Sequence, residues 1–196
     1  MENLAALLPA AFALMASPGP VTLASAGFGA AWGSSAIPLV LAMTAGTATI
    51  IVMVALGILG LITAVPGAEP VLMTLGGAYI LYLAWRIWHA PVSTRALQAG
   101  QMPSVATVYS GALANPKAYA AMAALFSGFP IFPEDPVTNG IAKVVLLIAF
   151  ATCVNLTWMS IGTALARLVT SPKAGRNLNR AFAVMLILSV GAMVIL

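Results

Sequence analysis

The feature that most constrains this chain is a series of apolar runs, each long enough to cross a membrane. A hydrocarbon core of roughly 30 Å requires about 20 apolar residues in a helix. The 196 residues are 62% hydrophobic and 6% charged, whereas soluble domains carry about 25% charged residues. The runs also lack the two-residue alternation of a membrane β-barrel. The sequence therefore predicts an all-α integral membrane protein with six transmembrane helices, at residues 4–31, 35–64, 69–89, 104–128, 139–167 and 178–196.

Basic residues are divided unevenly between the two sides of this predicted topology. Lysine and arginine concentrate in loops that face the cytoplasm. The gaps after spans three and five hold six basic residues, whereas the other side holds all four acidic residues and only Lys143, about a turn into span five. We therefore predict that both termini lie outside. No basic residue precedes span one, which we expect to be a permanent helix rather than a cleaved signal peptide.

Spans one and four are each interrupted by proline near the middle, in SPGP at 17–20 and in NPK at 115–117. Proline removes a backbone donor and clashes with the preceding turn. Irregular backbone survives at this depth only where it is buried in protein or faces a wet cavity. We therefore predict that both helices are broken, near Pro18 and Pro116. The half-helix beyond each break presents free N–H groups and a positive dipole end, which favour an anion such as a carboxylate.

Lys117 stands at the centre of span four, where a lysine costs roughly 2.5–3.5 kcal/mol on insertion scales. The sequence places no acidic residue in the interior of any span to pair with it. Lys117 must therefore rest on carbonyls freed at the breaks, on water, or on a substrate.

The two breaks also indicate an internal repeat. An offset of 98 residues aligns SPG at 17–19 with NPK at 115–117. Each break lies in the first span of a group of three, and because three is odd, the two groups run in opposite directions through the bilayer. Inverted repeats are typical of secondary transporters. We predict a single transmembrane domain over residues 1–196, with one repeat at about 1–90 and the other at about 104–196.

Few side chains suit a chemistry other than transport. Cys153 is the one cysteine, so the chain has no internal disulfide, CxxC redox pair or thiolate metal site; we expect it to be a buried apolar filler. His89 is the one histidine, and no nucleophile–base pair or P-loop is present. These counts argue against a membrane thiol-electron carrier, a membrane enzyme and a metal-ion carrier. We predict no enzymatic activity, no cofactor and no nucleic-acid partner.

Three segments resemble the signatures of the LysE/RhtB family of amino-acid exporters in order and spacing. They are SPGPVTLASAGFGAAWGSSAI at 17–37, LGGAYILYLAWR at 75–86 and GALANPKAYA at 111–120. The resemblance covers essentially the whole chain. It implies a carrier of the bacterial inner membrane that exports amino acids or close analogues, typically in exchange for protons. The motif residues that it carries over are Pro18, Gly19, Pro20, Asn115, Pro116 and Lys117, and more weakly Tyr79 and Tyr82.

The chain departs from this family in span two. Many members have an acidic residue directly after the glycine in the middle of that span, but here Thr47 follows Gly46. A threonine cannot carry a proton or pair with a substrate ammonium as a carboxylate does. The departure favours a neutral amino acid or an acidic small molecule over a strongly cationic substrate. It also leaves Lys117 as a candidate for the titrating group.

Polar side chains of span five are further candidates for the cavity. Asn155 and Trp158 are three residues apart, so they share a helix face, and Asn155 is costly in lipid and is expected to face inward. We predict that Asn155, Trp158, Thr47 and Tyr79 complete a substrate site with the motif residues. The predicted function is secondary-active export of amino acids or related small carboxylate-bearing metabolites, with transport of another small solute or ion as the alternative. The expected partners are this substrate and the bilayer, and homo-oligomerisation stays open.

Overall fold

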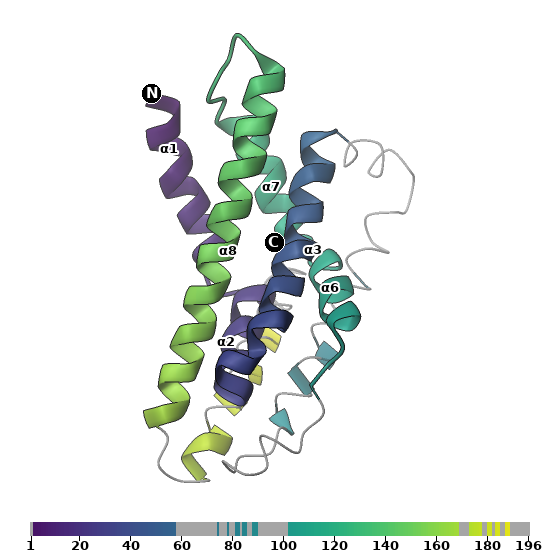
Figure 1. Ribbon diagram of the computed structural model, residues 1–196, viewed down its shortest axis with the longest axis vertical. Coiled ribbons are helices and arrows are strands. Elements are labelled where there is room, and N and C mark those ends of the chain that lie inside the picture. The colour runs from purple at the N-terminus through teal and green to yellow at the C-terminus, as the bar shows by residue number, and fades with distance from the viewer. Residues whose placement is uncertain are drawn as a thin grey trace.

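The computed structural model describes residues 2–57, 102–168 and 173–177, with further single positions between 74 and 89 and between 180 and 188. Every element assigned in these residues is a helix (Figure 1). Predicted spans three and six, with Tyr79 in span three, fall mostly or wholly outside the described residues. The elements are α1 (Glu2–Ala11), the π-helical η1 (Phe12–Ala16), α2 (Pro20–Trp32), the 3₁₀-helical η2 (Gly33–Ala36), α3 (Ile37–Ala55), α6 (Val105–Leu113), α7 (Pro116–Gly128) and α8 (Pro136–Leu168).

Two stretches of the described chain are helical, long and apolar enough to cross a membrane, namely Pro20–Ala55 and Pro136–Arg167. The first is turned back on itself at η2, so that α2 runs down and α3 runs up in Figure 1. Gly33 has a φ of 56° at this turn, which is a left-handed conformation that favours glycine. The predicted boundary between spans one and two at this position is confirmed.

Both predicted helix breaks are present. Helix η1 ends at Ala16 and α2 begins at Pro20, with Gly19 extended between them. Likewise α6 ends at Leu113 and α7 begins at Pro116. A proline at the first position of a helix loses no hydrogen bond, because that N–H has no intrahelical partner. The backbone match is therefore between Pro20 and Pro116, two residues away from the predicted pairing of Pro18 with Pro116.

Glycines allow close approach between α2 and α8. A Cβ on Gly29 of α2 would overlap the backbone of Met159 in α8, and a Cβ on Gly162 of α8 would overlap the backbone of Ala26 in α2. The hydroxyl of Thr163 donates to the carbonyl of Gly29 at 3.0 Å across this contact. Small residues and hydroxyl groups hold membrane helices together in this way. Helices α2 and α8 therefore pack backbone against backbone.

Buried apolar side chains form two clusters, one on each side of the helix breaks. The first lies among α2, η2, α3, α6 and α8 and contains Phe28 and Val108. The second lies among α1, α3, α7 and α8 and contains Leu7 and Leu125. The broken segments 17–19 and 114–115 separate the two clusters along the chain, so both breaks come at the level where apolar packing is interrupted.

One side chain of α8 differs from expectation, since Cys153 is exposed rather than a buried filler. Lys143, which the sequence places about a turn into span five, has no exposed surface. Its ammonium donates to the carbonyls of Leu125 at 3.1 Å and Phe126 at 2.7 Å, which belong to the last turn of α7. A cation there satisfies unpaired carbonyls and complements the negative helix end.

The connection between α7 and α8 is held by side-chain caps. The carboxylate of Asp135 accepts from the amides of Val137 and Thr138, each at 3.1 Å, and from the hydroxyl of Thr138 at 2.5 Å. These bonds, that of the hydroxyl foremost, hold the pKa of Asp135 below its ordinary value of 3.8. In the next turn the side-chain oxygen of Asn139 accepts from the amide of Ile131 at 2.7 Å. The loop is thereby folded onto the first turns of α8.

Candidate functional site

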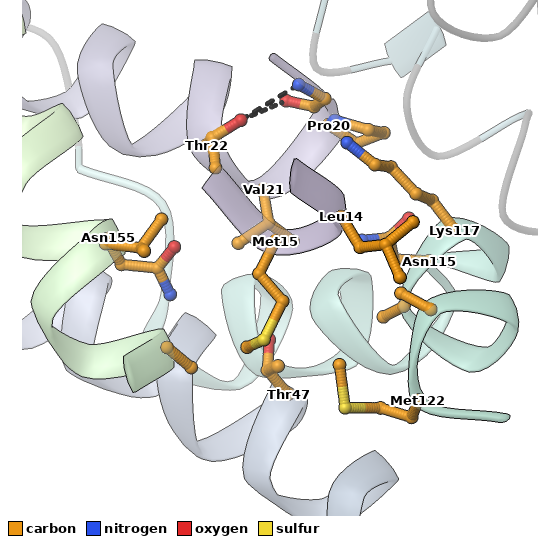
Figure 2. Close-up of a pocket in the computed structure, with 15 residues that line it drawn as sticks. Leu14, Met15, Pro20, Val21, Thr22, Thr47, Asn115, Lys117, Met122 and Asn155 are labelled. Atoms are coloured by element: carbon orange, nitrogen blue, oxygen red, sulfur yellow. Dashed lines mark hydrogen bonds between the residues drawn. The ribbon is translucent and has the colours of Figure 1, made fainter. Parts of the chain in front are cut away.

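A cavity of about 50 Å³ lies where the two helix breaks meet (Figure 2). It is bounded by η1, α2, α3, α7 and α8. A volume of this size accommodates a few water molecules or the head group of a small ligand. Figure 2 shows Asn155 on one side of the cavity and Lys117 and Asn115 on the other. The polar side chains among the described lining residues are Thr22, Thr47, Asn115, Lys117 and Asn155.

Lys117 reaches across from α7 to the broken segment of the first helix. Its ammonium donates to the hydroxyl of Ser17 at 2.8 Å, to the carbonyl of Ser17 at 3.1 Å and to the carbonyl of Pro18 at 3.4 Å. The break leaves these carbonyls without helical partners. Lipid offers no hydrogen-bond donor to them, so a side chain must supply one. Of the three partners that the sequence left open for Lys117, namely freed carbonyls, water and a substrate, the structure shows the freed carbonyls.

Other side chains satisfy the carbonyls that the two prolines of the SPGP segment leave without a partner. In a regular helix Pro18 would donate to Leu14, and Pro20 would donate to Ala16, but proline has no N–H. The hydroxyl of Ser17 donates to the carbonyl of Leu14 at 3.3 Å, and the indole N–H of Trp158 donates to the carbonyl of Ala16 at 3.1 Å. Trp158 thus stabilises the broken backbone and does not line the cavity.

Gly19 leaves room for Lys117, and its own backbone angles do not require glycine. Its φ of −167° and ψ of −179° are extended values that other residues adopt. A Cβ at this position would lie 2.8 Å from Nζ and 3.1 Å from Cδ of Lys117. The end of the lysine side chain would therefore have to shift to admit one.

The half-helices α2 and α7 both begin at the cavity, since Pro20, Val21, Lys117 and Ala118 all line it. They run in opposite directions from there, α2 down and α7 up in Figure 1. Each directs unpaired N–H groups and the positive end of its dipole toward the same space. With the Lys117 ammonium nearby, and no carboxylate among the described lining residues, the cavity is electropositive.

Helices α3 and α8 each contribute a polar side chain to the wall of the cavity. Asn155 is 3% exposed, and its amide nitrogen donates to the hydroxyl oxygen of Thr44 at 3.0 Å. Thr47 donates to the carbonyl of Met43 in its own helix at 3.2 Å. Both residues line the cavity. The inward orientation predicted for Asn155 is confirmed.

The structure brings together most of the residues predicted for the site. Gly19, Pro20, Asn115, Lys117, Thr47 and Asn155 line the cavity, and Pro116 begins the half-helix that carries two of them. Pro18 is exposed and contributes its carbonyl to Lys117. Tyr79 lies outside the described residues. Sequence reasoning missed Ser17 and Thr22 as individual contributors, although both lie within or beside SPGP, where small hydroxyl side chains commonly cap irregular backbone.

Comparison with known proteins supports the family resemblance. No match was found among curated proteins or among solved structures. A family model described as LysE type translocator matches residues 12–196. The match includes both helix breaks, the cavity and α8, and the family consists of transporters rather than enzymes. The chain therefore belongs to the LysE type translocator family of membrane transporters.

Proposed function

We propose that this protein is a secondary-active exporter of amino acids or related small carboxylate-bearing metabolites across the bacterial inner membrane. The observation that carries the proposal is the meeting of two half-helix N-termini and the Lys117 ammonium at one cavity. Broken helices whose N-termini point at an anionic substrate group are a recurring device of secondary transporters. We further propose six spans in two inverted repeats, with both termini on the outer side.

The substrate carboxylate is expected to bind beside the first turns of α2 and α7. A carboxylate in a low-dielectric site needs hydrogen bonds and a compensating charge, and unpaired backbone amides and Lys117 supply both. All three contacts of the Lys117 ammonium are to neutral oxygens of Ser17 and Pro18. A carboxylate is a stronger acceptor than any of these, so it competes for Lys117 and loosens the tie between α7 and the first break.

Coupling in this proposal does not use a carboxylate of span two, because Thr47 occupies the position and its hydroxyl is bonded within α3. Lys117 is then the group of the described cavity that can exchange a proton. Export driven mainly by the substrate gradient follows if Lys117 stays protonated throughout the cycle. Efflux from vesicles with and without an imposed pH difference distinguishes these two forms of secondary transport.

The proposal is tested by efflux from preloaded cells and from vesicles, using a panel of amino acids, dipeptides, analogues, hydroxy acids and inorganic ions. We expect at least one carboxylate-bearing solute to leave faster with the protein than without it. Lys117→Met should reduce this rate at least tenfold, whereas Lys173→Met, which changes an exposed lysine away from the cavity, should not. Transport restricted to solutes without a carboxylate, or unchanged transport in Lys117→Met, contradicts the proposal.

A further inference from the structure

Asn115 is unusual among the polar residues of the cavity because its side chain makes no hydrogen bond. It is 5% exposed, and its Oδ1 is the one buried side-chain oxygen or nitrogen without a partner among the residues that the structure describes. Buried polar groups are nearly always paired, and an exception calls for an explanation such as an absent ligand.

The absence of a hydrogen bond is unusual for the position that Asn115 occupies. It is the N-cap residue of α7, where asparagine normally accepts from an amide of the first turn, yet it makes no side-chain cap. The caps of the neighbouring helices do use their side chains: Ser104 accepts from the amide of Thr107 at 3.1 Å, and Asp135 accepts from Thr138 at 3.1 Å. The side chain of Asn115 therefore does not make the N-cap hydrogen bond that is usual at this position.

The chemistry of a primary amide indicates what would satisfy it. Asn115 lines the cavity and carries one carbonyl acceptor and two N–H donors. The terminal torsion of asparagine is broad, so a small rotation turns either atom toward a bound molecule. An α-amino acid has an ammonium and a carboxylate on adjacent carbons. It can donate to Oδ1 and accept from Nδ2 at the same time, whereas a hydroxy acid or a dicarboxylate offers no charged donor to Oδ1.

The remaining lining residues restrict the side chain of such a ligand. No Asp or Glu belongs to the described lining, so a second positive charge would face Lys117 without compensation. A second negative charge would find no further cationic side chain among the described lining residues. Ala118, Ala121, Ala151 and Val154 form an apolar part of the wall, which suits a short uncharged side chain in about 50 Å³.

We propose that Asn115 recognises the ammonium and the carboxylate of an α-amino acid together, and that the cavity selects zwitterions with a short uncharged side chain. This inference rests on the proposed function and narrows its substrate class. Asn115 acts here as a specificity-determining residue, and its amide oxygen, which has no partner within the described protein, becomes paired when the ligand binds.

The test compares matched pairs that differ only at the amino group, L-alanine with L-lactate and L-valine with L-2-hydroxyisovalerate. The purified full-length protein is assayed by counterflow in liposomes and by ligand-induced shifts of its melting temperature in detergent. We expect the wild-type protein to prefer the amino acid of at least one pair by tenfold or more, and to prefer it over L-lysine. Equal affinity for both members of every pair overturns the inference.

Variants of Asn115 provide the second part of the test. Asn115→Leu removes an unpaired buried polar group, so the ligand-free protein should melt no lower than the wild type, while the amino-over-hydroxy preference should fall below threefold. Asn177→Leu, at an exposed asparagine, should keep the full preference. Retained preference in Asn115→Leu overturns the inference, and so does a lower melting temperature of that variant without ligand, since this would show a structural role.

A third variant covers the case in which leucine prevents folding. Asn115→Asp keeps the shape of the side chain, and it should retain the amino-over-hydroxy preference and admit L-lysine more readily. Loss of that preference in Asn115→Asp counts against the inference. Failure of the proposed function looks different: no carboxylate-bearing solute of the panel is moved at all, and Lys117→Met behaves like the wild type.

Discussion

The ammonium of Lys117 donates to both the hydroxyl and the carbonyl oxygen of Ser17, at 2.8 and 3.1 Å, across 100 residues of sequence. One side chain of α7 thereby satisfies the broken backbone of the first helix and also lines the cavity. The structural and the substrate-binding roles of this lysine are consequently linked.

Lys117→Met is expected to lower both stability and transport. It removes the hydrogen bonds from the ammonium to Ser17, which is half-buried, and to Pro18, which is exposed; a hydrogen bond from a charged group contributes roughly 1.5–3 kcal/mol. Ser17→Ala removes one of the three contacts and should cost about 1 kcal/mol. Thermal unfolding in detergent, recorded beside efflux, measures both effects. A Lys117→Met protein that melts like the wild type but does not transport would assign Lys117 to the substrate alone.

The contact between α2 and α8 should be intolerant of even one added methyl group. Gly29→Ala and Gly162→Ala each place a Cβ against the backbone of the opposite helix, and backbone cannot move aside as a flexible side chain can. We expect each variant to lose roughly 1–3 kcal/mol or more. The matched control is Gly140→Ala in α8, where a Cβ meets nothing within 4 Å, and which should gain about 0.5–1 kcal/mol. Wild-type melting temperatures for Gly29→Ala and Gly162→Ala would show that the helices separate freely.

Trp158 should stabilise the first helix break through the carbonyl of Ala16. Trp158→Phe removes the indole donor, which lies 3.1 Å from that carbonyl oxygen, and should cost roughly 1–2 kcal/mol. Pro20→Ala should not restore this loss, because the extended Gly19 precedes Pro20 and the N–H at the first position of a helix has no intrahelical partner. A double-mutant cycle of unfolding free energies measures any coupling between the two changes. A Pro20→Ala change that recovers the loss would show that the helix can close across the break.

The protein should lose stability at low pH when Asp135, which caps the start of α8, becomes protonated. Because the pKa of Asp135 is lowered in the folded state by the Thr138 hydroxyl, its charged form stabilises the protein fully above its ordinary pKa of 3.8. This contribution is lost as the pH falls from that value through the lowered pKa. The wild type should therefore melt higher than Asp135→Asn at neutral pH, and the difference should close below pH 3.8. A difference that does not change with pH would show that the charge contributes nothing.

Much of the site could be predicted because the relevant signals are local and strong. Proline in the middle of a span has few tolerable solutions in lipid, so the breaks followed from sequence, and freed carbonyls were one of three possible partners of Lys117. The partner of Trp158 did not, because its helix face indicated only that it points inward. The burial of Lys143 did not follow from sequence either. The sequence places it about a turn into span five, and its burial depends on the approach of the last turn of α7 to α8, which is a tertiary contact.

The bond between Ser17 and Lys117 also has a consequence for biosynthesis. Ser17, in the first break, is synthesised 100 residues before Lys117, which donates to its carbonyl. At a synthesis rate of about 5–20 residues per second, the carbonyls of the break wait roughly 5–20 s for that donor. During this time a nascent chain that stops short of Lys117 carries unpaired carbonyls at bilayer depth. We therefore expect the first helix to reach its full stability in lipid only once the fourth hydrophobic segment has left the ribosome.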